Sequence, residues 1–208
     1  MYVGVHIPKT AGSSFRTVIH QHFKCAEDYG PHKSQSSTQV TYAKDNTHRV
    51  SLLKKEGFEF VWGHFRHDKY TSVDSSLKVV TWVREPLEAV ISGFNFMLRV
   101  DDPYNNTNQK VRAGELSFID FVCLPNIRKF QQKWLEGLEP QKLAFVGLTE
   151  DFENDVSRFL AIEGKPITNI PKENVSKKYD YQPTSYEIAA ARKELSCEYA
   201  FYWEMIRL

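Results

Sequence analysis

The sequence predicts an α/β fold in which a mainly parallel central sheet is flanked by helices. Short β-rich runs alternate with segments of helical periodicity, and parallel strands are usually joined by crossover helices. The clearest run, residues 77–83, is almost entirely apolar or β-branched, as expected for a central strand buried on both faces. At 208 residues the chain suits one domain with a substantial core.

The remaining elements follow from the same patterns. Further strands are expected at residues 2–7, 58–62 and 143–148. Helices are expected at residues 13–23, 48–55, from Pro86 to Leu98, and at residues 116–122, 126–135, 150–162 and 184–207. The polar residues 25–46 are expected to form a surface loop, residues 101–114 a substrate-facing loop, and residues 164–183 an irregular segment.

Composition excludes several classes of protein. A net charge of +1 gives no overall attraction to nucleic acid or to a membrane surface, so affinity for anions must be local. The three cysteines are widely spaced and odd in number, which argues against a disulfide framework or a zinc cluster and suits a reducing compartment. No apolar run approaches the ~20 residues that span a bilayer, and strand-like residues begin at Tyr2 without a leader. We therefore expect a cytoplasmic protein or the catalytic domain of a longer one.

The turn between the first strand and the first helix has the composition of an anion site. It contains Lys9, Gly12 and the hydroxyl groups of Thr10, Ser13 and Ser14. The first N–H groups of a helix lack internal partners, and the helix dipole places partial positive charge there. The turn is not a Walker A loop, because Lys9 precedes the glycine. It predicts a phosphate or sulfate cradle, with an ordinary turn capped by a serine as the alternative.

A second candidate anion site follows the central strand. Arg84 comes directly after this strand, and Ser92 lies in the next helix. An arginine fork suits a phosphate group, and a serine hydroxyl would complete the pocket. The alternative is a salt bridge from Arg84 to Glu85 or Glu88, with Ser92 as a small packing residue. Because ligands of parallel sheets bind at the carboxyl ends of the strands, the first turn, the pair Gly63-His64 and Arg84 are expected at one edge.

Together these motifs resemble a known family. The run from His6 to Phe15 (HIPKTAGSSF), followed by a strand, Arg84-Glu85-Pro86 and Ser92, looks like the sulfotransferases that use 3′-phosphoadenosine 5′-phosphosulfate (PAPS). Within that family the motifs are most similar to the carbohydrate branch, with heparan sulfate 2-O- and chondroitin-type enzymes. The resemblance implies a single P-loop-like domain over residues 1–208 that transfers the sulfuryl group of PAPS to a hydroxyl, on a carbohydrate, and releases adenosine 3′,5′-bisphosphate.

The resemblance also implies roles for individual residues. Lys9, Thr10, Ala11, Gly12, Ser13 and Ser14 would wrap the 5′-phosphosulfate, with Lys9 near the leaving oxygen. Arg84 and Ser92 would hold the 3′-phosphate, and the late loop with Ser176 and Lys177 would close over the nucleotide. His64 matches a catalytic histidine of the heparan 2-O branch, whereas the second histidine of that branch is replaced here by Trp62.

Histidine chemistry agrees with the role of a base for the acceptor hydroxyl, because an imidazole titrates near neutrality. His67 is the reserve candidate for the base, and a structural role for His64 is the alternative. Trp82 is expected in the core rather than stacked on adenine. No metal site is predicted, since histidines and cysteines lack ligand spacing. Two other functions stay open: a P-loop-type nucleotide kinase, and a sulfotransferase-like domain that binds nucleotide or a sulfated ligand without turnover.

Overall fold

The computed structural model describes residues 1–30, 36–167, 170 and 181–207. Its contacts divide the chain into two compact units. The first, here called the sheet unit, comprises Met1–Val83 and Trp134–Asn174. The second, the helical unit, comprises Arg84–Lys133 and Val175–Leu208.

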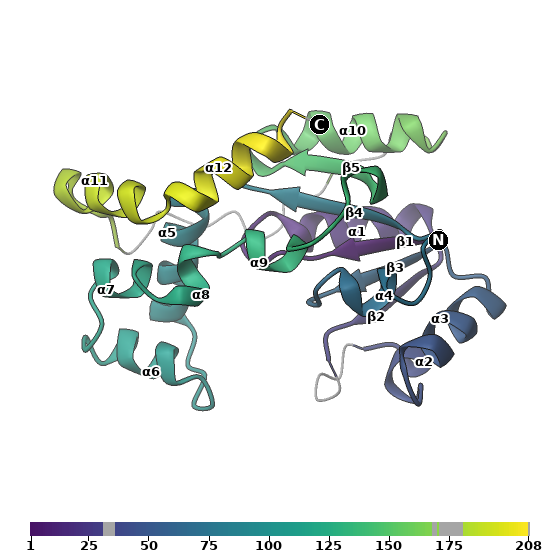
Figure 1. Ribbon diagram of the computed structural model, residues 1–208, viewed down its shortest axis with the longest axis horizontal. Coiled ribbons are helices and arrows are strands. Elements are labelled where there is room, and N and C mark those ends of the chain that lie inside the picture. The colour runs from purple at the N-terminus through teal and green to yellow at the C-terminus, as the bar shows by residue number, and fades with distance from the viewer. Residues whose placement is uncertain (31–35, 168–169, 171–180, 208) are drawn as a thin grey trace. The chain divides into compact units, whose positions relative to one another are not determined.

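The sheet unit is built on five parallel strands, which confirms the predicted fold class (Figure 1). The strands are β1 (Tyr2–Val5), β2 (Cys25–Asp28), β3 (Phe60–Gly63), β4 (Lys78–Val83) and β5 (Leu143–Leu148). Their order across the sheet is β2-β3-β1-β4-β5, so the first strand lies in the middle. The predicted strand at residues 143–148 is observed with the same bounds.

The strand order fixes where a ligand can bind. Val5 of β1 aligns with Gly63 of β3 and with Thr81 of β4, so the carboxyl ends of these strands meet at one edge. After β1 the chain moves to β2 at one edge of the sheet, whereas after β4 it moves to β5 at the opposite edge. The order therefore reverses between β1 and β4, and crevices at such switch points are the usual ligand sites of open α/β sheets.

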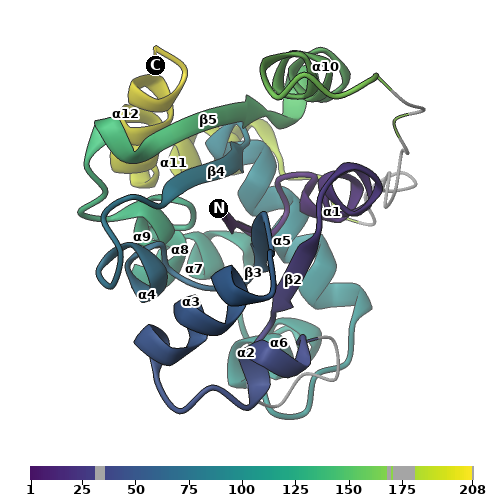
Figure 2. The ribbon, with the colours of Figure 1, turned by 90° about the vertical axis from the view of Figure 1, so that its right-hand side faces the viewer.

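One face of the sheet carries an aromatic core. The helices α1 (Gly12–His22) and α10 (Phe152–Ile162) cover this face, and Figure 2 shows both on the same side of the strands. Phe15 of α1 packs on Trp82 with ring centroids 3.7 Å apart. Trp82 is fully buried, which places it in the core as expected. Gly4 leaves room for another ring of this core, because a Cβ atom there would lie 2.2 Å from the Trp62 ring.

The predicted loop at residues 25–46 is partly wrong, because its first residues form the edge strand β2. Cys25–Asp28 has the sequence CAED, whose acidic residues disfavour a strand. Partners elsewhere in the sheet unit neutralise both acids. Glu27 lies 2.6 Å from Arg16 and 2.7 Å from His20 of α1, and Asp28 lies 2.5 Å from Lys69. The charges of Arg16 and Lys69, together with the hydrogen bond from His20, allow the buried acids to take part in the sheet.

The opposite side of the sheet carries shorter helices. Figure 2 shows α3 (Asn46–Lys55) and α4 (Asp68–Thr71) on this side, with α2 (Thr38–Thr41) beside α3. The helix predicted at 48–55 begins two residues earlier than expected, because Asp45 caps it: the Asp45 side chain accepts a hydrogen bond from the His48 N–H. A 3-10 turn, Pro140–Lys142, precedes β5, and a second, Thr149–Asp151, precedes α10.

The helical unit has a core of its own. The long helix α5 (Pro86–Arg99) contributes Val90, Ile91 and Phe94 to this core. The other helices are α6 (Asn106–Arg112), α7 (Phe118–Val122), α8 (Pro125–Arg128), α11 (Ser185–Glu194) and α12 (Ser196–Met205), while α9 (Gln132–Leu135) begins in this unit and ends in the sheet unit. The predicted loop at 101–114 thus contains a helix, and the predicted C-terminal helix is divided at Leu195. Within the described residues, no helix combines the length and the apolar character needed to cross a membrane.

Candidate functional site

The turn between β1 and α1 has an unusual backbone. Lys9 has a φ of 68° and Ala11 a φ of 60°, and they are the only non-glycine residues with positive φ in the described part of the chain. For a residue with a Cβ this left-handed conformation costs about 1–2 kcal/mol. Such strain clusters at ligand sites, where the surrounding fold holds the backbone in the required geometry. The turn is therefore shaped for more than a simple reversal of the chain.

The N-terminus of α1 is left without a side-chain cap. Ala11 occupies the N-cap position, no side chain accepts a hydrogen bond there, and the first turn contains no acidic residue. The helices α2, α4, α8, α10 and α12 also lack a side-chain cap, whereas five others have one. A side chain caps α3, α5, α6, α7 and α11, namely Asp45, Glu85, Asn105, Ser117 and Thr184 respectively. No acidic side chain offsets the partial positive charge at this end of α1, and such charge favours an anion.

The side chains of the turn divide into two groups. The Thr10 hydroxyl is buried and donates to the carbonyl of Ile7 at 2.8 Å, so it stabilises the turn itself. Ser14 is buried, whereas Lys9 and Ser13 are partly exposed. A lysine beside uncapped N–H groups is the arrangement that binds phosphate and sulfate esters. The predicted cradle therefore has suitable backbone geometry, with Thr10 acting through the turn.

His64 follows β3 and has a defined tautomer. Its Nδ1 lies 2.8 Å from the carbonyl oxygen of His6. Because a carbonyl oxygen only accepts hydrogen bonds, Nδ1 carries the proton and donates it. In the neutral ring the lone pair is then on Nε2, which is the protonation pattern of a general base.

His6 connects this histidine to the turn, a role that sequence reasoning missed. The two imidazole rings are stacked, with centroids 4.2 Å apart and an interplanar angle of 24°. His6 also stacks on Trp62, with ring centroids 5.2 Å apart. The His6 ring lies against Gly12, the first residue of α1, because a Cβ atom on Gly12 would be 2.0 Å from the ring. Register explains the pairing, since Val5 aligns with Gly63 and each histidine is the next residue. The position of each histidine directly after a strand was the sequence signal that could have predicted their contact.

The reserve candidate His67 is placed differently. It is buried, its Nδ1 lies 3.0 Å from the Thr71 hydroxyl and its Nε2 lies 3.0 Å from the carbonyl of Glu136. Both ring nitrogens are therefore used in hydrogen bonds that hold α4 and the segment after α9. This geometry favours His64 over His67 as a base.

The second predicted anion site belongs to the helical unit. The backbone N–H and carbonyl of Arg84 both pair with the Gln131 side-chain amide at 2.8 Å. The guanidinium lies 3.4 Å from the carboxylate of Glu88, and Ser92 is buried in α5. The ion pair is the one that the alternative interpretation expects, although 3.4 Å is long for a charge-assisted hydrogen bond.

The remaining predictions concern the late loop and metals. Ser176 and Lys177 lie outside the described residues. Among the residues that are described, no group of three His, Cys, Asp or Glu side chains has the arrangement of a metal site.

Comparison with known proteins gives a result only at the level of structure. No family model matches the sequence, and no curated protein matches it. The sulfotransferase from Alicyclobacillus acidocaldarius is similar, with a TM-score of 0.52, 12% identity and 94% of each chain covered. The fold is that of a sulfotransferase.

A mouse protein is also similar in structure. It is the sulfotransferase SULT7A1 complexed with PAP, with a TM-score of 0.46 and 14% identity. The match covers 93% of this chain and 64% of the mouse protein, so this chain spans less than two thirds of the mouse sulfotransferase. At 12% identity the bacterial match supports the P-loop-like α/β fold alone, and activity has to be argued from the site.

Proposed function

We propose that the protein is a PAPS-dependent sulfotransferase that modifies a hydroxyl group of a carbohydrate. The observation that carries the proposal is the strained, uncapped turn at the carboxyl end of β1, with Lys9 in it and His64 tied to it through His6. An anion cradle beside a base with a fixed tautomer is what sulfuryl transfer to a hydroxyl requires.

The cradle would bind the phosphosulfate end of the nucleotide. The N–H groups of Gly12, Ser13 and Ser14 begin α1 and face no side-chain cap. They and the Lys9 ammonium would stabilise negative charge on the leaving oxygen, and fixed donors do so without reorganising during the reaction. When bound, PAPS supplies the activated sulfuryl group. Arg84 and Ser92 are assigned to its 3′-phosphate, and Ser176 and Lys177 to closure over the nucleotide, on the resemblance of the motifs.

His64 would take the proton from the acceptor hydroxyl. Its Nε2 lone pair accepts that proton, while Nδ1–H continues to donate to the His6 carbonyl at 2.8 Å. The carbonyl dipole then stabilises the imidazolium that forms, and the hydrogen bond keeps the ring in one orientation. A general base of this kind contributes about 10²–10⁴-fold to the rate.

A transfer assay tests the proposal. The protein is incubated with PAPS that carries radiolabelled sulfate and with a panel of neutral and acidic oligosaccharides, and both labelled product and adenosine 3′,5′-bisphosphate are measured. We expect both products to form in equal amounts. Lys9→Ala is expected to abolish transfer, whereas Lys55→Ala, which removes an exposed charge from α3, is expected to leave it unchanged.

The same assay separates the competing functions. A nucleotide kinase would instead transfer phosphate from ATP–Mg²⁺ and leave PAPS unused. A binding domain without turnover would bind adenosine 3′,5′-bisphosphate but give no labelled product with any acceptor. Wild-type rates in Lys9→Ala would remove the lysine from the leaving oxygen.

A further inference from the structure

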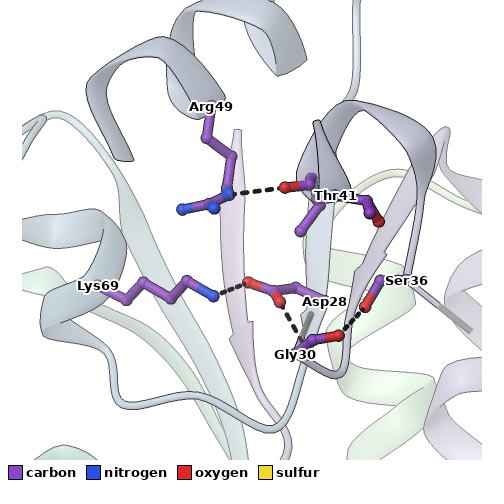
Figure 3. A pocket seen from close by; sticks show the side chains of 7 residues that line it. Asp28, Gly30, Ser36, Thr41, Arg49 and Lys69 are labelled. Carbon is purple, nitrogen blue, oxygen red and sulfur yellow. Dashed lines mark hydrogen bonds and ion pairs between the residues drawn. The ribbon is translucent and has the colours of Figure 1, made fainter. Parts of the chain in front are cut away.

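A small pocket, most of whose lining residues are polar or charged, opens beside the carboxyl end of β2 (Figure 3). Its volume is about 110 Å³. Asp28 of β2, Arg49 of α3 and Lys69 of α4 line it, together with Ser36 and Thr41. All of these residues belong to the sheet unit.

Asp28 does not offer its charge to a ligand, because its carboxylate already accepts several hydrogen bonds. Oδ2 accepts from Lys69 at 2.5 Å and from the Tyr70 hydroxyl at 2.8 Å, and Oδ1 accepts from the Gly30 N–H at 3.3 Å. The residue is 1% exposed. Burial, with the nearby Asp28 charge, raises the pKa of Tyr70, so the phenol keeps its proton and remains a donor. Asp28 therefore serves to hold Lys69 in place.

Arg49 supplies the charge that is not balanced. Its Nε donates to the Val40 carbonyl at 3.3 Å, and its Nη1 donates to the Asn46 side chain, both of which are neutral groups. Within the described residues it has no carboxylate partner. Asp28 cancels the charge of Lys69, so the pocket has a net charge of about +1 from the guanidinium. Figure 3 shows the Arg49 and Lys69 side chains extending toward the same space.

The hydrogen-bonding groups that the pocket can offer to a ligand are donors. A guanidinium has five N–H groups and an ammonium three, so both cations retain donors beyond the bonds described above. The size of the pocket limits what these donors can bind. A cavity of about 150 Å³ holds a benzene molecule, so 110 Å³ suits a group of about four or five heavy atoms rather than a nucleotide.

We propose that this pocket binds a singly charged oxyanion, a carboxylate or sulfate group, that is carried by the acceptor molecule. This inference rests on the proposed function, since it assigns the pocket to the substrate that receives the sulfuryl group. It identifies the acceptor as an anionic hydroxyl compound and Arg49 as the residue that determines this specificity.

The position of the pocket relative to His64 supports the acceptor assignment. Asp28 aligns with Gly63, the residue before His64, and neighbouring strands lie about 5 Å apart. The Tyr29 ring, which follows Asp28, lies 5.2 Å from the His64 ring. Because Asp28 and Tyr29 point to opposite faces of the sheet, an acceptor that fills the pocket crosses the edge of the sheet to reach His64.

Direct binding of an anion tests the pocket independently of activity. Sodium sulfate is titrated at constant ionic strength into protein saturated with adenosine 3′,5′-bisphosphate, so that the cradle is already filled. We expect Arg49→Gln to weaken sulfate binding about tenfold or more, the effect of one charge-assisted hydrogen bond. Lys55→Gln removes the same charge from the same helix at an exposed position and is expected to bind sulfate as the wild type does. Equal sulfate affinity in all three proteins would show that the pocket is not an anion site.

Matched acceptors test the substrate class. Methyl glucuronoside is compared with its uncharged amide, and 4-hydroxyphenylacetate with 4-hydroxyphenylacetamide, so that only the charge differs within a pair. We expect kcat/KM to favour the carboxylates about tenfold or more, a preference that Arg49→Gln abolishes and Lys55→Gln retains. Arg49→Lys, which keeps the charge, is expected to retain part of the preference and serves if the glutamine variant does not fold.

The outcomes are distinguishable. If sulfate binding depends on Arg49 but acceptor preference does not, the pocket takes a free anion and the acceptor assignment is wrong. If no acceptor is sulfated by any variant while sulfate binding still depends on Arg49, the proposed transferase function fails and the anion site stands. Unchanged preference together with unchanged sulfate affinity contradicts the inference as a whole.

Discussion

At the scale of single residues, the hydrogen bond between His64 and the His6 carbonyl makes a specific prediction. His64→Ala should lower turnover about 10²–10⁴-fold, because it removes the proposed general base. Affinity for adenosine 3′,5′-bisphosphate should stay within about twofold, since the nucleotide is bound by N–H groups and by Lys9 rather than by the imidazole. Initial rates and calorimetric titration measure the two quantities.

His48→Ala provides the control for that experiment, because His48 lies on α3 and is outside the proposed site. Its turnover should equal that of the wild type. Full activity in His64→Ala would assign the proton transfer to another group, whereas a parallel loss of nucleotide affinity would show that the imidazole shapes the cradle.

A second prediction at this scale concerns the cysteines. Burial, and to a lesser extent the Glu27 charge, raises the pKa of the Cys25 thiol from 9.0 to about 12. Since the thiolate is the reactive form, Cys25 should be alkylated by iodoacetamide much more slowly at pH 8 than the exposed Cys197. The rate at Cys25 should keep rising about tenfold for each pH unit above pH 9 until the pH nears the pKa of about 12. Mass spectrometry of time points measures both sites, and a plateau at Cys25 near pH 9 would contradict the expected pKa.

At the scale of elements, the closeness of Gly4 to the aromatic core predicts a large effect of a small change. A Cβ on Gly4 would lie 2.2 Å from the Trp62 ring and 2.5 Å from the Phe60 ring, both fully buried in the core. Gly4→Ala should therefore lower the free energy of unfolding by about 2 kcal/mol or more, as overpacking in a rigid core does. Urea denaturation followed by fluorescence measures the change.

Gly93→Ala is the matched control, because a Cβ there meets its nearest neighbour, the Phe130 ring, at 3.6 Å. This distance is an ordinary contact, and alanine is favoured over glycine inside a helix by about 1 kcal/mol. The control should keep or slightly raise stability. If Gly4→Ala were equally stable, β1 would have to move away from β3 at no cost.

Elements with a strong local pattern were predictable from the sequence. Residues 143–148 have the bounds expected, and the strand expected at residues 77–83 is observed as Lys78–Val83. The strand β2 was not predictable, because its CAED sequence becomes compatible with a sheet only through Arg16, His20 and Lys69. Such pairs depend on the tertiary fold, which local propensity does not contain.

The candidate site shows the same division. The turn with Lys9 and the residue His64 could be named because each follows a recognisable strand. The contact between His6 and His64 could not, since it joins residues 58 positions apart and depends on the register of β1 against β3. Arg49 was missed because its role depends on α3 and α4 lining one pocket.

At the scale of the whole molecule, the resemblance of the motifs assigns Arg84 to the 3′-phosphate of the nucleotide. Arg84→Ala should weaken binding of adenosine 3′,5′-bisphosphate about tenfold or more, as expected for the loss of an arginine that binds phosphate. Arg99→Ala removes the same charge from an exposed position in the last turn of α5 and should bind normally. Calorimetric titration measures both variants. Wild-type affinity in Arg84→Ala would remove this arginine from the 3′-phosphate and leave it as the partner of Glu88.

Nucleotide binding should also be visible in the thermal stability of the chain. A ligand that binds only the folded protein adds about 2.7 kcal/mol at a concentration of one hundred times Kd. For a chain of 208 residues this corresponds to a rise in Tm of about 5–10 °C with adenosine 3′,5′-bisphosphate. Lys9→Ala should reduce the rise, because it removes a cation from the cradle, and ATP–Mg²⁺ should give a smaller one. A larger rise in Tm with ATP–Mg²⁺ than with the bisphosphate would show that the β1 turn binds a different nucleotide. The proposed sulfotransferase function would then be wrong, although the fold is that of a sulfotransferase.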